Sequence, residues 1–199
     1  MIGPSDVLDF WFGDLDESGS ADAEHSKQWF KKDPEFDAEI RTRFESSYQA
    51  IASGEREDWL SKPEGALAYV IVLDQFSRNM YRDSAQMYAA DDRALTAARQ
   101  AITAGFDAQL PSDQRVFLYM PLMHAEDREA QAECVSHMEK LVAELGADPD
   151  SRAAANLKYA RWHQDVVDRF GRFPHRNPIL GREHTPEEQS YLDEGGHSF

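Results

Sequence analysis

The sequence predicts an all-α protein, an array of about eight or nine helices packed as antiparallel pairs. Every long segment repeats its apolar residues with a period of about 3.6, and none shows the sustained alternation of a β-strand. Proline, serine, aspartate or threonine stands where most of these segments begin, and glycine stands where most of them end. Short turns therefore join the helices, as in a helical array.

Two short helices are predicted at the start of the chain. Pro4 opens the first, which Gly13 ends, and the polar loop 14–22 comes after it. The second closes at Trp29 and Phe30.

Three longer helices are predicted next. Asp33 with the next proline begins the first, and Gly54 stands just past its end. Its apolar face consists of Phe36, Ile40, Phe44 and Ile51. Pro63 opens the next helix, and a third is predicted over 84–104 with Gly105 after it. Alanines along this third helix would let a neighbouring helix approach closely.

The next two helices surround a proline. Pro111 begins one, and Pro121 must either kink it or start a new helix, because proline cannot donate to the carbonyl four residues back. Asp127 is the predicted cap of a helix over 128–145, which Gly146 ends.

The end of the chain combines a long helix, a loop and a short helix. The pair Asp148–Pro149 is predicted to start the long helix and Gly171 to end it. The segment 172–184 is too rich in proline and glycine for a helix, so we expect an irregular loop. Thr185 and Glu188 then form a capping box for the short helix.

The composition predicts one domain and excludes several classes of partner. A chain of 199 residues that is 41% hydrophobic can bury a sizeable core, which fits a single all-helical domain over 1–199. Its formal net charge of −16 repels nucleic acid and anionic membrane surfaces, so neither is an expected partner. No signal peptide and no apolar window of about 20 residues is present, and we expect a soluble cytoplasmic protein.

The sequence predicts no metal site and no cofactor. Cys134 is the only cysteine and lies on an apolar helical stripe, which favours a packed structural thiol. No HExxH spacing occurs, and His124 with Glu126 would supply at most two metal ligands.

The stretch LDQFSRNMYRD, residues 73–83, carries the first candidate site. The apolar stripe of its helix continues through Asp74 and Arg78, while Gln75 and Asn79 lie four apart on the adjoining face. One interpretation is a polar clasp that holds the next loop by an ion pair. The other is a ligand pocket lined by all four side chains.

His124 and Glu126 are candidate proton-transfer groups. His124 extends an interior stripe through Phe117 and Met120, and Glu126 comes two residues later at the turn. A histidine on an apolar face is also compatible with a satisfied core residue, and the same holds for His163 in the last long helix.

The loop 172–184 is a basic segment in an acidic chain. It holds three arginines against one glutamate, a formal charge of about +2 before its histidines are counted: Arg172, Arg176, Arg182 and Glu183, with His175 and His184. The arginines of this loop are expected to bind either the acidic helices of the protein itself or a small anion. In the second case Arg172, Arg176 and Asn177 bind the anion and His175 transfers a proton.

These residues are compatible with two functions. If the loop folds back over the helix that ends after Asn79, we expect His175 or Arg176 within side-chain reach of Asp74, Arg78, His124 or Glu126. The protein would then bind a small anionic ligand, or act on it as an enzyme whose reaction the residues do not specify. The alternative is a helical scaffold that binds a peptide or partner protein on its concave surface.

Five stretches resemble one known family. They are VLDFWFG at 7–13, QWF at 28–30, LDQFSRNMYR at 73–82, LYMPLMHAED at 118–127 and FGRFPHRN at 170–177. With them the chain resembles an uncharacterised bacterial family with a domain of unknown function and a tetratricopeptide-like helical fold. The resemblance covers nearly the whole chain and implies the fold, but it brings no activity or catalytic residue. The 34-residue tetratricopeptide repeat itself is absent from the sequence.

Overall fold

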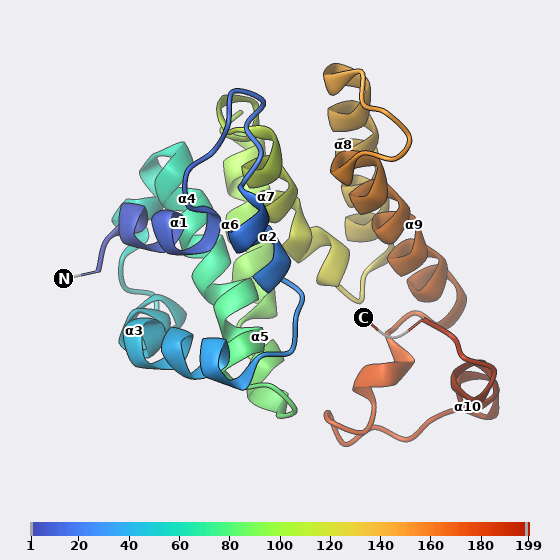
Figure 1. Ribbon diagram of the computed structural model, residues 1–199. Helices are drawn as coiled ribbons and strands as arrows, with labels where there is room; N and C mark the ends of the chain where they lie inside the picture. Colours follow the sequence, from blue (N-terminus) through green and yellow to red (C-terminus); the bar gives the residue numbers. More distant parts are fainter. Residues whose placement is uncertain (1, 198) are drawn as a thin grey trace. The chain divides into compact units, whose positions relative to one another are not determined.

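The computed structural model describes residues 2–197 and 199, which form helices joined by turns (Figure 1). Within these residues there is no β-strand, and an isolated β-bridge joins Leu15 to Ala21 in the polar loop. The all-α prediction is confirmed. None of the described helices combines the length and the apolar character that crossing a bilayer requires.

The chain packs as two compact units. Unit 1 comprises Met1–Arg82 and Gln86–Pro121, and unit 2 comprises Asp83–Ala85 and Leu122–Phe199. The division falls at Pro121 inside one helix, Ser112–His124 (α7), which continues through the proline. The single domain predicted from the chain length stays a prediction.

Unit 1 is built from the helices of the first half of the chain. They are Pro4–Phe12 (α1), Ala23–Gln28 (α2), Pro34–Ala52 (α3), Pro63–Ile71 (α4), Ser77–Met80 (α5), Asp91–Thr103 (α6) and the first part of α7. Helix α4 packs against α1 and α6, and α3 packs against α5. The alanines Ala94 and Ala98 of α6 are fully buried, as the predicted small-residue seam requires.

Aromatic rings fill the core of unit 1. Trp11 of α1 meets Phe117 of α7 edge to face at 5.7 Å, and Phe44 of α3 lies 4.6 Å from Phe76. Each such pair contributes about 0.5–1.5 kcal/mol beyond the area it buries. Helices distant in sequence are therefore tied together by ring contacts.

Unit 2 contains one long helix pair and a C-terminal region. Its helices are Arg128–Leu145 (α8), Arg152–Phe170 (α9) and Pro186–Asp193 (α10), with a 3₁₀ turn at Pro174–Arg176. Helices α8 and α9 pack along each other as an antiparallel pair, and α10 contacts the 3₁₀ turn (Figure 1). Phe173 packs with Val166 and Val167 in a core cluster of this unit. The tetratricopeptide-like arrangement of the helices stays a prediction.

The predicted helix caps are confirmed at several ends. The Asp33 carboxylate accepts hydrogen bonds from two backbone amides of α3, and the Asp127 carboxylate accepts one from α8. Thr185 and Glu188 form the predicted capping box of α10. At the other end of α8, Gly146 has φ +54°, a left-handed conformation that glycine adopts without strain.

Two predicted helix boundaries are wrong. The helix predicted over 84–104 is a 3₁₀ turn at Ala85–Tyr88 followed by α6, because Ala90, just before α6, has φ −108° and ψ 7° and so interrupts the helical backbone. Helix α9 begins at Arg152, not at Asp148. The Ser151 hydroxyl caps it, while the Asp148 carboxylate accepts the amide of Asp150 in the preceding turn.

Candidate functional site

The stretch 73–83 contains a π-helical turn that the sequence pattern did not predict. Helix α4 continues through this turn, Val72–Phe76, into α5 without a break. A π turn inserts one residue and rotates the helix after it, and such turns often occur at functional sites. Here it buries Asp74 and Gln75, which are 1% and 6% exposed.

Arg78 joins the π turn to α6. Its guanidinium lies 3.1 Å from the Asp74 carboxylate and forms two hydrogen bonds, each of 3.0 Å, with the carboxylate of Asp91. Burial opposes the charge of Arg78, but Asp74 and Asp91 outweigh it and raise the pKa of the guanidinium. The polar clasp predicted for this helix is therefore present, and it holds the first residue of α6.

The other two predicted side chains of this stretch also bond within unit 1. The Asn79 amide donates to Asp37 of α3 at 2.7 Å, and the Gln75 amide donates to Asp74 at 2.6 Å. Arg82 adds two bonds to the same Asp37 carboxylate. The bonds to Asp37 fasten α3 to α5 and to the turn that follows it. A ligand-binding role for the four residues stays a prediction, as does a cleft that they share with the basic loop.

Glu126 anchors the basic loop within unit 2. Its two carboxylate oxygens accept hydrogen bonds from Arg182 at 2.6 and 2.8 Å, and one also accepts the amide of Phe173 at 2.7 Å. Burial raises the pKa of Glu126, but Arg182 and the Phe173 amide outweigh burial, and the net shift is downward. Glu126 is thus an ionised anchor, and the proton-transfer role predicted for it stays untested.

Arg172 and Asn177 form hydrogen bonds within the same unit. Arg172 donates to both oxygens of Glu188, at 2.6 and 2.8 Å, and this pairing lowers the pKa of Glu188 to about 2. The Asn177 side chain is fully buried between Glu188 and Arg182. Arg172 and Arg182 of the basic loop therefore pair with acidic residues of the protein itself, as one of the two interpretations predicted.

Three histidines converge beside this anchor. The rings of His124 and His163 lie 6.2 Å apart, and both histidines interact electrostatically with His175. Nδ1 of His163 is 2.8 Å from the carbonyl oxygen of Tyr159, so this nitrogen carries the proton and donates. Burial, followed by the charge of neighbouring groups, lowers the pKa of His163 to about 3 and that of His175 to about 4. Both imidazoles are neutral at physiological pH.

Arg176 adds a guanidinium to this cluster. It is 7% exposed, and its guanidinium lies over the Phe173 ring at 4.5 Å. The charge of Arg176 lowers the pKa of Glu126, and the charge of Glu126 acts in turn on His175. Whether either side chain lies within reach of Glu126 stays a prediction. Nδ1 of His175 is buried and has no hydrogen-bond partner in the described chain. We call His124, His163, His175 and Arg176 the histidine cluster.

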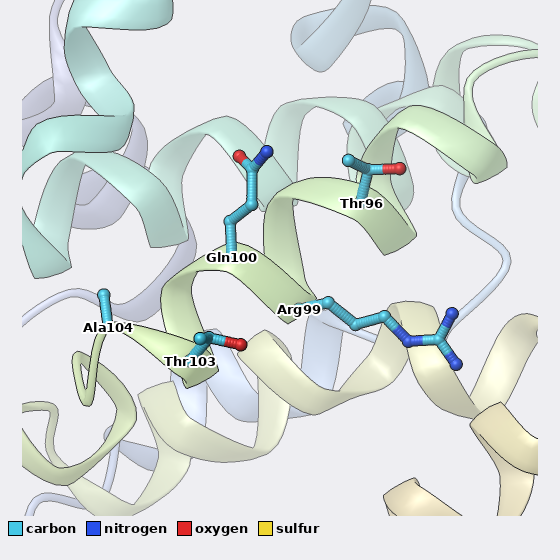
Figure 2. A pocket seen from close by; sticks show the side chains of 5 residues that line it. All are labelled: Thr96, Arg99, Gln100, Thr103 and Ala104. Atoms are coloured by element: carbon cyan, nitrogen blue, oxygen red, sulfur yellow. The ribbon is translucent and has the colours of Figure 1, made fainter.

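A surface depression of about 460 Å³ lies elsewhere, on the exposed face of α6. Figure 2 shows the side chains that line it: Thr96, Arg99, Gln100, Thr103 and Ala104. All come from one helix and its cap, and none was predicted as a site residue. The part of the chain that the structure describes has no group of three or more histidine, cysteine or acidic side chains that could hold a metal ion.

The described residues form an all-helical protein. Its second unit contains the histidine cluster, in which the Arg176 side chain is buried. The chain belongs to the family described as bacterial protein of unknown function (DUF924), whose model matches residues 7–196. It is similar to the solved structure of the protein of unknown function ATU0120 from Agrobacterium tumefaciens, with 41% sequence identity and a TM-score of 0.81. The match covers 96% of this chain and 97% of that one. None of the curated proteins matches.

Proposed function

We propose that unit 2 binds a small anionic ligand at the histidine cluster. The observation that carries the proposal is the buried Nδ1 of His175, which has no hydrogen-bond partner in the described chain and is acted on by the charges of Arg176 and Arg182. The charges of Arg176, Glu126 and Arg182 act on His175 there. An anion would give the imidazole nitrogen a partner, and the two arginines would attract it.

The acidity of the whole chain does not prevent this binding. At physiological salt, repulsion from exposed charges beyond a Debye length of about 8 Å is screened, so the groups lining the site dominate. A bound anion also favours the charged form of a nearby imidazole and raises its pKa. Below this raised pKa, protonated His175 would donate to the ligand, and above it the imidazole stays neutral.

The same group fits general-base chemistry. An imidazole that is neutral at physiological pH, like that of His175, can accept a proton from a bound substrate. Glu126 is less suited to this role, because both of its oxygens already accept hydrogen bonds. An enzyme of this kind would therefore use His175 rather than Glu126 on an anionic substrate.

Calorimetric titration with phosphate, sulfate and acetate tests the proposal. We expect binding to the wild type and a loss of about tenfold or more in affinity in Arg176→Gln and in His175→Gln, since bonds to charged groups contribute about 1.5–3 kcal/mol. Arg169→Gln is the matched control, because Arg169 is an exposed arginine of α9 that pairs with Glu187. The proposal fails if none of the three anions binds, or if the control variant loses as much affinity as Arg176→Gln. Circular dichroism establishes that each variant is folded.

A further inference from the structure

The ring of Phe199 lies in a slot formed by the histidine cluster. It stacks on the imidazole of His163, with centroids 3.5 Å apart and planes inclined by 22°. It meets Phe173 and His175 edge to face, at 6.0 and 5.9 Å. A flat ring from the end of the chain thus occupies a space bounded by α9 and by the loop after it.

The walls of the slot contact one another without Phe199. The ring of Phe173 is fully buried and lies 5.5 Å from His163 and 5.7 Å from His175. His163 is held in addition by its hydrogen bond to the Tyr159 carbonyl. The slot is therefore preorganised, and removing the Phe199 ring leaves its walls supported.

Phe199 closes this slot incompletely. The residue is 40% exposed although it contacts three walls. The preceding chain has its own anchor, because the His197 ring stacks on Trp162 at 4.4 Å and the His197 amide donates to the Tyr191 hydroxyl. The ring of Phe199 can thus leave the slot while the segment before it stays attached.

Positive charge adjoins the slot. The Arg176 guanidinium lies 4.5 Å above the ring of Phe173, which is itself a wall of the slot. The unbonded Nδ1 belongs to His175, another wall. The walls of this apolar, planar space therefore carry a guanidinium and an imidazole nitrogen that has no hydrogen-bond partner in the described residues.

We propose that this slot binds the planar aromatic ring of an anionic ligand, an aryl carboxylate or aryl phosphate, in the place of Phe199. The ring stacks on His163, and the anionic group lies toward Arg176 and His175. The inference rests on the proposed function and adds the ligand class to it. Stacking on an imidazole selects a flat ring, because a puckered aliphatic ring cannot approach its whole face.

Phe199 then acts as a competitor built into the chain. Ligand and Phe199 cannot occupy the slot together, so the apparent affinity is reduced by the fraction of molecules in which the slot is open. Removing the ring of Phe199 should strengthen the binding of aromatic anions. It should leave acetate almost unchanged, since acetate needs only the charged part of the site.

Calorimetry with benzoate, phenyl phosphate, cyclohexanecarboxylate and acetate tests this proposal on the wild type and on Phe199→Ala. We expect benzoate or phenyl phosphate to bind more tightly than cyclohexanecarboxylate, and Phe199→Ala to raise the affinity for the aromatic anion about tenfold. The aryl probe that binds more tightly identifies the anionic group. The control is Phe30→Ala, which removes a 70% exposed phenylalanine ring from unit 1 and should change nothing.

The outcomes separate this inference from the proposed function. If acetate and benzoate bind equally well and Phe199→Ala has no effect, the aromatic slot is refuted while anion binding stands. If no anion binds to either protein, both proposals are refuted. An equal gain for cyclohexanecarboxylate in Phe199→Ala would also overturn the inference, because the slot would then not select a planar ring.

Discussion

The guanidinium of Arg182 holds both carboxylate oxygens of Glu126, at 2.6 and 2.8 Å. The pair ties the basic loop to the chain just after α7, and the Phe173 amide adds a third bond to the same carboxylate. The Glu126 anchor adjoins the candidate site, because Phe173, whose amide it accepts, is also a wall of the aromatic slot. Glu126 therefore positions the loop that carries His175 and Arg176.

Replacing Glu126 should loosen this loop. In Glu126→Gln the carboxylate charge is lost and Arg182 keeps its own, so we expect unfolding to become easier by about 1–3 kcal/mol. The value is moderate because both side chains are about one-quarter exposed. Urea denaturation measures the loss, and hydrogen exchange should speed up in residues 172–184.

Glu139→Gln is the matched control for that experiment. Glu139 pairs with Arg161 at 2.9 Å, but more than half of each side chain is exposed. Exposed pairs contribute about 0–1 kcal/mol, so little stability should be lost. Equal losses in the two glutamine variants would show that the Glu126 anchor is an ordinary surface pair.

Arg78→Ala should be strongly destabilising. It leaves the carboxylate of Asp74, which is 1% exposed, without its cation, and we expect a loss of about 3–5 kcal/mol. Arg161→Ala, from the exposed pair of unit 2, should lose less than about 1 kcal/mol. Chemical denaturation of both variants compares them. A loss below about 1 kcal/mol for Arg78→Ala would contradict the buried clasp.

Mild acid should destabilise the protein through His163. Its pKa is lowered to about 3 in the folded state from an ordinary value of 6.5, so the unfolded chain takes up the proton first as the pH falls. The stability present above pH 6.5 is therefore lost progressively toward pH 3, with a slope of at most about 1.4 kcal/mol per pH unit from this group. Unfolding free energies of His163→Gln should fall less steeply than those of the wild type. Parallel curves for the two proteins would refute this assignment.

Cys134 should be unreactive in the folded protein. Its thiol is 1% exposed on the α8 stripe, and burial raises its pKa. The thiolate is the reactive form, so a thiol reagent such as dithionitrobenzoate should label the protein only after denaturation. Rapid labelling of the native protein would contradict the packed position.

Local signals in the sequence were sufficient for most of the fold. Asp33 and Asp127 cap the helices they were predicted to cap, since a cap depends on residues within one turn. The predicted start of α9 is wrong because Asp148 and Ser151 both offer capping oxygens, and the amide that each one accepts depends on the folded chain. The π turn was missed because an inserted residue changes the helical period without leaving a compositional signal.

The candidate site was less predictable, since its partners are distant in the sequence. The charges of Asp74 and Arg78 were visible, but nothing in the sequence singled out Asp91 as the second acid of the clasp. The sequence places Arg182 in the basic loop. It does not predict the bond to Glu126, because the two residues are 56 positions apart. His163 looked like a core residue, which its burial supports, and no pattern placed Phe199 against it.

Proton uptake on anion binding tests the central claim most directly. Sulfate is a suitable probe, because it does not titrate near neutral pH. Its binding enthalpy is measured by calorimetry at about pH 6 in two buffers of different ionisation enthalpy, for the wild type and His175→Gln. The groups around His175 are His124, Arg176, Arg182 and Glu126, and a sulfate opposing the arginines raises the pKa of His175 from about 4 toward its ordinary 6.5. The wild type should therefore take up protons on binding, and His175→Gln should take up fewer. Binding without proton uptake, or no binding of sulfate at all, would contradict an anion site at the histidine cluster.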